Sequence, residues 1–282
     1  MTTYRTINVA TLAAALICAL AVTVAPSLAQ EHSHEAPSPP ALKWSFAGPF
    51  GKYDEGQLQR GFKIYKEVCA NCHSMDLLAI GSLAEPGGPG FSEAQVAALA
   101  AEYKIKDVDD KGEPVERAGR PADHFPAPFA NTLAAAAAYS VAPPDMSTLA
   151  KARGYQRGFP WFVFDVFTQY QEQGPDYIAA LLKGYMKAPK DFKVPAGGNY
   201  NEYFPGHVTA MPKPLANGQV SYDDGSPQTL DQYSKDVSAF LMWAAEPKLV
   251  QRKRIGFQVI IFLIVLSGLL YFTKKKVWSA VH

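Results

Sequence analysis

The pentapeptide Cys69-Ala70-Asn71-Cys72-His73 decides what kind of fold this chain can have. Two cysteines three residues apart, followed at once by a histidine, form the attachment signal for a c-type haem. The two thiols can form thioether bonds to one edge of a porphyrin, and the imidazole can then bind the iron. We therefore predict one covalently bound haem c, held by Cys69 and Cys72, with His73 as an axial ligand.

Three other interpretations of this motif compete with haem attachment. A thioredoxin-like redox pair would follow a β-strand, a zinc site would need more ligands at a matching spacing, and the third is a purely structural pair. The residues ahead of the motif instead predict a helix that opens at Asp54 and Gln57, because its inward side chains recur every three or four positions. Those side chains are Leu58, Phe62, Tyr65, Cys69 and Cys72. The motif is thus expected late in an amphipathic helix, which favours haem.

A second axial ligand would close the iron to oxygen and peroxide. Met211 is the preferred candidate, because Pro212 and Pro214 stiffen the loop that presents its thioether. The histidines His124 and His207 are rivals. Four further methionines suit the role less, being too close to His73, inside a helix or at helix ends: Met75, Met146, Met186 and Met242.

Both ends of the chain are expected to lie outside the folded head. Residues 1–29 combine a basic start, an apolar run and a small-residue ending, as in a secretory signal peptide. Residues 30–43 are polar and proline-rich, which predicts a flexible arm. Residues 248–282 form the expected membrane anchor, with an uncharged span at about 255–272 between two basic clusters. Export would place the head in the periplasm of a bacterial inner membrane protein and the C-terminus in the cytoplasm.

The head, residues 44–247, is predicted to be one mainly α domain with long ordered loops. Further helices are expected to begin at Ser92 with Gln95, at Asp176, and at Thr229 with Gln232, the last ending before Pro247. No strand ladder is evident in the sequence. A few helices joined by long proline- and glycine-rich loops need something central to pack against.

Charge is distributed unevenly along a chain whose net charge is only +1. Residues 30–247 hold 19 Lys and Arg against 26 Asp and Glu, whereas residues 248–282 hold seven bases and no acid. An acidic head argues against nucleic acid and suits a basic protein partner. One polar segment without periodicity is dense in acids: Asp107, Asp109, Asp110, Glu113 and Glu116. Asp223 and Asp224 are the next candidates for a docking surface.

From Trp44 to Ser279 the chain resembles the cytochrome c1 family, the haem subunit of the alphaproteobacterial and mitochondrial cytochrome bc1 complex. The residues that carry the resemblance are Gln59-Arg60-Gly61, Val68 to Met75, Asp123 to Pro126, Pro143 to Ser147, Lys151 to Arg153, Asp176-Tyr177, Leu181 to Tyr185, Asn199 to Gly206, Ala210-Met211-Pro212 and Lys235 to Pro247. The motif by itself indicates only a c-type haem, and the Trp243 to Pro247 ending joined to a membrane helix is more specific.

The resemblance implies a cytochrome c-like haem domain with one C-terminal transmembrane helix, and it places the family's methionine ligand on Met211. It also implies a subunit of quinol–cytochrome c oxidoreductase without acid or base catalytic residues. Such a subunit passes one electron from the Rieske iron–sulfur protein to a soluble or membrane-tethered cytochrome c, beside cytochrome b.

One departure from the family concerns the haem propionates, which an arginine often reaches from the run before Pro143. This chain has Ala134 to Ser140 there instead, so Arg120 or Arg153 is left as a possible substitute. Two other classes of protein stay open on the residues alone. One is a haem peroxidase with a displaceable sixth ligand, and the other is an anchored c-type shuttle that serves a different complex.

Overall fold

A computed structural model describes residues 36–153, 159–160, 164–165 and 173–279. The expected signal peptide and the first part of the expected arm, residues 30–35, lie outside the described residues. The described elements run in chain order as α2 (Glu55–Glu67), η1 (Cys69–Asn71), η2 (Ile80–Ala84), α3 (Glu93–Ala101), β1 (Lys104–Val108), β2 (Pro114–Ala118), α4 (Thr132–Tyr139), α5 (Leu149–Ala152), α7 (Gln173–Lys183), β3 (Asn199–Tyr200), η3 (Pro205–His207), β4 (Val208–Thr209), α8 (Leu230–Ala245) and α9 (Leu249–Trp278).

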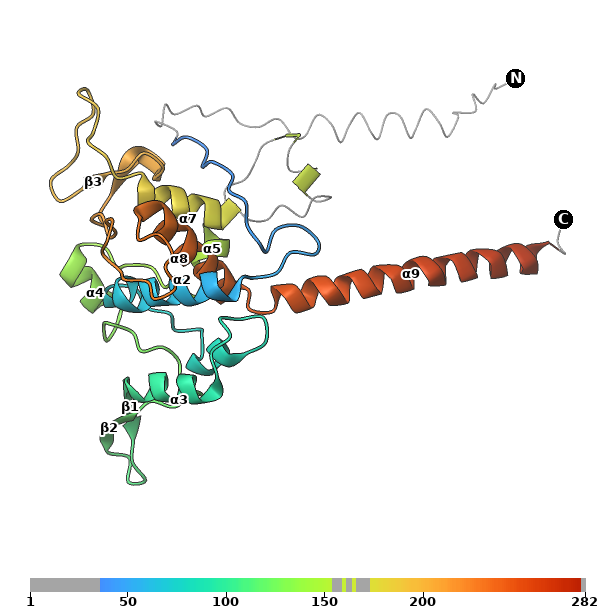
Figure 1. Cartoon of the computed structure of the whole chain (residues 1–282), viewed down its shortest axis with the longest axis horizontal. Helices are drawn as coiled ribbons and strands as arrows, with labels where there is room; N and C mark the ends of the chain where they lie inside the picture. Colours follow the sequence, from blue (N-terminus) through green and yellow to red (C-terminus); the bar gives the residue numbers. More distant parts are fainter. Residues whose placement is uncertain (1–35, 154–158, 161–163, 166–172, 280–282) are drawn as a thin grey trace, which may run out of the picture. The chain divides into compact units, whose positions relative to one another are not determined.

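The core of the head forms where α2, α5 and α7 contact α8 (Figure 1). The predicted N-caps of three helices are confirmed, because the side chains of Asp54, Ser92 and Thr229 each accept a hydrogen bond from the backbone three residues on. Helices α2 and α8 cross at Gly61, where an added Cβ would lie 2.2 Å from the carbonyl oxygen of Asp236. Only a glycine permits this close approach.

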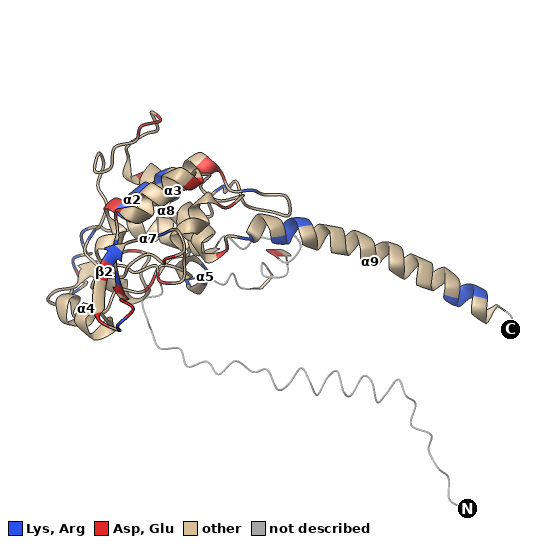
Figure 2. Cartoon of the chain, turned by 90° about the horizontal axis from the view of Figure 1, so that it is seen from below, with Lys and Arg blue, Asp and Glu red and all other residues tan. Residues whose placement is uncertain are grey.

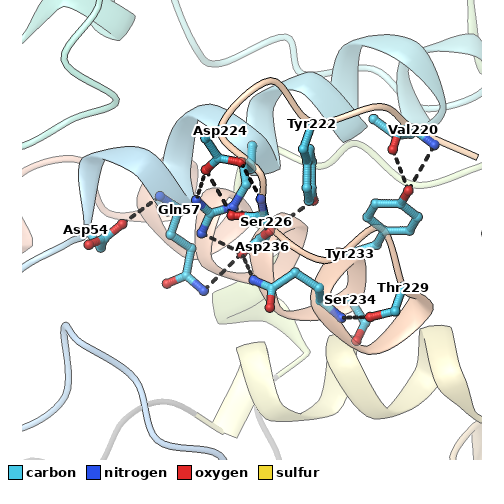
Figure 3. A network of polar contacts seen from close by, with 12 residues as sticks. Asp54, Gln57, Val220, Tyr222, Asp224, Ser226, Thr229, Tyr233, Ser234 and Asp236 are labelled. Atoms are coloured by element: carbon cyan, nitrogen blue, oxygen red, sulfur yellow. Dashed lines mark hydrogen bonds and ion pairs between the residues drawn. The ribbon is translucent and has the colours of Figure 1, made fainter. Parts of the chain in front are cut away.

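A buried polar network fixes the same crossing (Figure 3). The carboxylate of Asp236 is fully buried, and it accepts hydrogen bonds from Arg60 Nε at 2.9 Å, from the Tyr222 hydroxyl at 2.9 Å and from Gln232 Nε2 at 2.9 Å. Burial opposes the charged form of Arg60, but hydrogen bonds to Asp236 and Asp224 raise its pKa above the ordinary value. The pair ties the helix that leads into the haem motif to the last helix of the head.

Helix α7 begins at Gln173, three residues earlier than expected. Asp176 does not cap it, because its buried carboxylate accepts hydrogen bonds from the Trp44 indole at 2.8 Å and from the backbone N–H of Leu42 at 2.9 Å. The end of the N-terminal arm is thereby held against the head.

The expectation that the head lacks strands is wrong for two short antiparallel pairs, β1–β2 and β3–β4. The acidic segment around Asp109 is part of a hairpin and is not an aperiodic loop. The Asp109 carboxylate stabilises the turn by accepting hydrogen bonds from the backbone N–H groups of Lys111 and Glu113. Gly112 in the same turn has a φ of +83°. Both faces of the hairpin carry charged side chains, so no apolar alternation marks it in the sequence.

Helix α9 is long and apolar enough to cross a membrane, and the expected span lies within it. Basic residues lie near both of its ends, with an uncharged stretch between them (Figure 2). Its first residue, Leu249, is only 2% exposed and belongs to the core of the head. The packed core therefore extends beyond Pro247, where the sequence places the end of the domain.

Candidate haem site

The haem motif follows α2 and does not lie inside it, which corrects the expectation of a continuous helix. The α-helix ends at Glu67, and Cys69–Asn71 form a 3₁₀ turn. The amide of Asn71 reaches back to donate to the carbonyl oxygens of Glu67 and Val68 at 3.1 and 3.2 Å, so it satisfies carbonyls at the helix end. A local side-chain bond thus ends the helix despite favourable apolar spacing.

Cys69 and Cys72 are both free thiols and both partly exposed. Burial, with a smaller contribution from the neighbouring Cys72, raises the pKa of the Cys69 thiol to about 12. Redox-active cysteines show the opposite shift, because the thiolate is the nucleophile. Among the residues that the structure describes, no group of three or more His, Cys, Asp or Glu could hold a metal ion. The raised pKa of the Cys69 thiol disfavours the thioredoxin-like interpretation.

His73 is oriented by a backbone carbonyl. Its Nδ1 lies 2.8 Å from the carbonyl oxygen of Pro144, which can only accept, so Nδ1 must carry the hydrogen. The ring is 9% exposed, and burial lowers its pKa despite opposing contributions from Pro144 and Asp145. A neutral imidazole with a lone pair on Nε2 is the form that binds a metal.

The loop that supplies Pro144 is fastened to the segment after His73. Asp145 accepts from the Ser74 hydroxyl and from the backbone of Asp76, both at 2.8 Å. Met146 donates its backbone N–H to the carbonyl of Ser74 at 2.8 Å. Because several bonds join the two loops, the carbonyl that orients the imidazole is itself held in place.

Met211 lies beyond the β3–β4 pair and is partly buried. Its backbone is held on both sides, since its N–H donates to Thr209 Oγ1 at 3.2 Å and its carbonyl accepts from the Tyr185 hydroxyl at 3.1 Å. Its role as the second axial ligand stays a prediction. Met75 and Met242 are buried in the core, and Met186 is 51% exposed beyond the end of α7.

The rival histidines have local partners of their own. His124 is exposed, and its Nδ1 contacts the carbonyl oxygen of Asp76. His207 stacks on Tyr200 with ring centroids 5.5 Å apart and an angle of 17° between the planes. Its Nδ1 also lies 3.3 Å from the carbonyl of Asn201. Both rings therefore have local partners other than iron: a backbone carbonyl for His124 and the Tyr200 ring for His207.

The residues near the motif include one that sequence reasoning missed. The hydroxyl of Tyr139, at the end of α4, lies 3.2 Å from Cys72 Sγ. The alanine run that interrupts the family pattern thus folds as a helix whose last residue reaches the motif. The only signal in the sequence was an aromatic residue ending that run. Arg120 and Arg153 are exposed, and either one as a partner of the propionates stays a prediction.

Two cysteines that can bond to a porphyrin edge, followed by a buried and oriented imidazole, suit a c-type haem protein, and the Met211 thioether could supply a second iron ligand. The family model described as "Cytochrome C1 family" matches residues 44–281. This chain therefore belongs to the cytochrome c1 family.

Named relatives agree with the family assignment. A "Cytochrome c1" of Blastochloris viridis is 51% identical over 86% of this chain and 88% of its own length. A "Cytochrome c1, heme protein, mitochondrial" of Saccharomyces cerevisiae is 39% identical over 90% of this chain and 75% of its own. A "Cytochrome b/c1" of Bradyrhizobium diazoefficiens is 59% identical over 97% of this chain, which spans only 40% of that relative's length.

Proposed function

We propose that this chain is the electron-transferring haem subunit of a quinol–cytochrome c oxidoreductase. It would accept one electron from a Rieske iron–sulfur protein and pass it to a soluble or membrane-tethered cytochrome c, while cytochrome b carries out the quinol chemistry. The observation that carries the proposal is the buried His73, oriented by the Pro144 carbonyl and placed directly after Cys69 and Cys72. Membership of the cytochrome c1 family supports it.

Each site residue has a separate role in this proposal. Cys69 and Cys72 would form the two thioethers, and His73 and Met211 would be the axial ligands. When bound, haem c supplies a reversible one-electron iron couple. The bonds that fasten Pro144, Asp145 and Met146 to the motif would keep the imidazole in one position in both oxidation states. No general acid or base is assigned, because electron transfer needs none.

The rival classes make different predictions from this one. A peroxidase needs a displaceable sixth ligand, so its absorption spectrum should change on addition of cyanide or peroxide. We expect the spectrum of this protein to resist both reagents. An anchored shuttle should purify alone, whereas we expect the detergent-solubilised chain to copurify with cytochrome b and a Rieske protein. Isolation of the intact chain without either subunit would contradict the proposed complex.

Truncation tests the proposed topology of a periplasmic head, a single span and a cytoplasmic tail. Ending the chain after Pro247 or after Arg254 should in both cases release a soluble, haem-bearing head into the periplasm. The shorter fragment should be less stable by about 2 kcal/mol, because it loses the buried Leu249 side chain. Equal thermal unfolding midpoints would contradict this, and failure of both fragments to acquire haem would mean that the head cannot fold without α9.

Substitutions in the β1–β2 hairpin test whether this acidic surface docks a basic cytochrome c. An acidic surface raises the encounter rate by about one to three orders of magnitude at low salt. Turnover should fall as salt rises, because the screening length shrinks from about 30 Å at 0.01 M to about 8 Å near physiological strength. The test variant neutralises all five acids to Asn or Gln: Asp107, Asp109, Asp110, Glu113 and Glu116.

This variant should flatten the salt dependence without moving the haem potential. Asp107 is expected to contribute least, because it already pairs with Arg117 at 2.5 Å. Hydrogen bonding to that arginine lowers the pKa of the Asp107 carboxyl. A salt slope that stays at the wild-type value would exclude the hairpin and direct the search to Asp223 and Asp224.

A further inference from the structure

One face of α9 contacts the head near the start of the helix. Leu249, Lys253 and Phe257 follow one another at intervals of four residues, so their side chains lie in a row along the helix. The first residue of the row is a buried leucine, the second is a lysine, and the third is an aromatic residue inside the uncharged span. Each of the three has a defined partner in the head.

The partners of Lys253 and Phe257 lie in one loop of the head, at residues 46–50. Leu249 packs into the core. The ammonium of Lys253 donates to the carbonyl oxygen of Phe46 at 2.6 Å and also to that of Gly48. The ring of Phe257 meets the ring of Phe50 edge-on, with centroids 5.4 Å apart and planes at 76°. The loop therefore follows α9 from Lys253 to Phe257, about 6 Å of helical rise.

The tip of this loop is apolar and exposed. Gly48 has a φ of +70°, and an added Cβ at Gly51 would lie 2.1 Å from the carbonyl oxygen of Ala47, so the turn depends on glycine at both positions. Phe50, between them, is 70% exposed even with its contact to Phe257. A large aromatic side chain is thus presented outward on a tightly shaped turn.

The position of Phe257 sets the depth of this tip. It is the third residue of the uncharged run that begins at Ile255, about 3 Å along the helix from its start. Aromatic side chains are enriched at this level of a membrane, where hydrocarbon meets headgroups. Lys52 and Arg254 are exposed beside the tip and the start of the span, where cations can meet lipid phosphates.

We propose that the turn Gly48–Lys52 is a second membrane contact, in which Phe50 inserts into the lipid interface beside α9. The partner is the lipid bilayer, with Lys52 and Arg254 facing anionic headgroups. Two contacts, one spanning and one interfacial, would fix the tilt of the head on the membrane, which one helix by itself would leave free to vary. This inference rests on α9 crossing the membrane and is independent of the proposed electron transfer.

Spin labelling of the full-length chain tests the proposal in vesicles of phosphatidylcholine with phosphatidylglycerol. Three single substitutions receive the label: Phe50→Cys, Leu133→Cys on the exposed face of α4 as the aqueous control, and Val265→Cys in the middle of the span as the lipid control. Wild-type chain treated in the same way gives the background from native cysteines. Relaxation of each label by oxygen, which concentrates in lipid, is compared with relaxation by a water-soluble nickel chelate.

The label at position 50 should be relaxed more by oxygen than by nickel, as at position 265 and opposite to position 133. A label at 50 that behaves like the one at 133 would show that the loop stays in water and would overturn the proposal. Shielding from both reagents when the same labelled chain is in its native complex would show that a protein subunit covers Phe50, which would also overturn it. A water-exposed label at position 265 would remove its premise.

Discussion

Replacing Met211 with leucine should leave the haem attached and lower its reduction potential. The change does not touch Cys69 and Cys72, which we propose as the two thioether positions. A thioether ligand favours ferrous iron, so its loss removes that preference. Each tenfold loss of preference for the ferrous state lowers a one-electron potential by 59 mV. We expect a drop of roughly 100 mV or more, measured by redox titration of the purified chain.

The histidines provide the matched controls for this substitution. His124→Ala and His207→Ala should leave the potential near its wild-type value, because these rings contact Asp76 and Tyr200. Cyanide should also bind the Met211→Leu protein and not the wild type, since the sixth position would be open. An unchanged potential in Met211→Leu together with a lowered one in either histidine variant would assign the ligand to that histidine.

Replacing Asp236 with alanine should destabilise the head more than any surface substitution. The change leaves the Arg60 guanidinium and the amide of Gln232 without their buried acceptor. Removing one partner of a buried ion pair costs about 3–5 kcal/mol. The measurement is the free energy of unfolding of the solubilised, haem-bearing chain in denaturant, followed by circular dichroism.

Asp231→Ala is the control within the same helix. Asp231 pairs with Lys183 and Lys235 at the surface, where such pairs contribute about 1 kcal/mol or less. The double variant Arg60→Met with Asp236→Leu should recover much of the lost stability, because it removes both charges of the pair together. If the Asp236→Ala and Asp231→Ala proteins have equal free energies of unfolding, the network in Figure 3 contributes little to the crossing of α2 and α8.

Local signals explain why much of the head could be predicted. A capping side chain acts on backbone N–H groups three residues away, so Asp54, Ser92 and Thr229 mark helix starts without any tertiary contact. The haem motif is also local, since both cysteines and the histidine lie within five consecutive residues, Cys69 to His73. The apolar span of α9 depends on length and composition alone.

Other features depended on partners far away in the chain. Helix α7 begins three residues before the predicted start at Asp176. The side chain of Asp176 accepts hydrogen bonds from Trp44 and Leu42, more than 130 residues earlier, and does not cap the helix. The β1–β2 hairpin was missed because its pairs are charged on both faces, so no hydrophobic alternation reveals it. The proximity of Tyr139 to Cys72 likewise follows from the path of a loop between them.

The sequence by itself determined the haem-attachment motif, the main helices of the head and the membrane helix, because each is specified by neighbouring residues. Only the tertiary structure decided which nitrogen of His73 carries the hydrogen, through the carbonyl of Pro144 at 71 residues' distance. It also decided that the turn around Phe50 lies against Phe257, since that contact joins residues more than 200 positions apart. Contacts of this range depend on how the whole chain packs, and no local pattern encodes them.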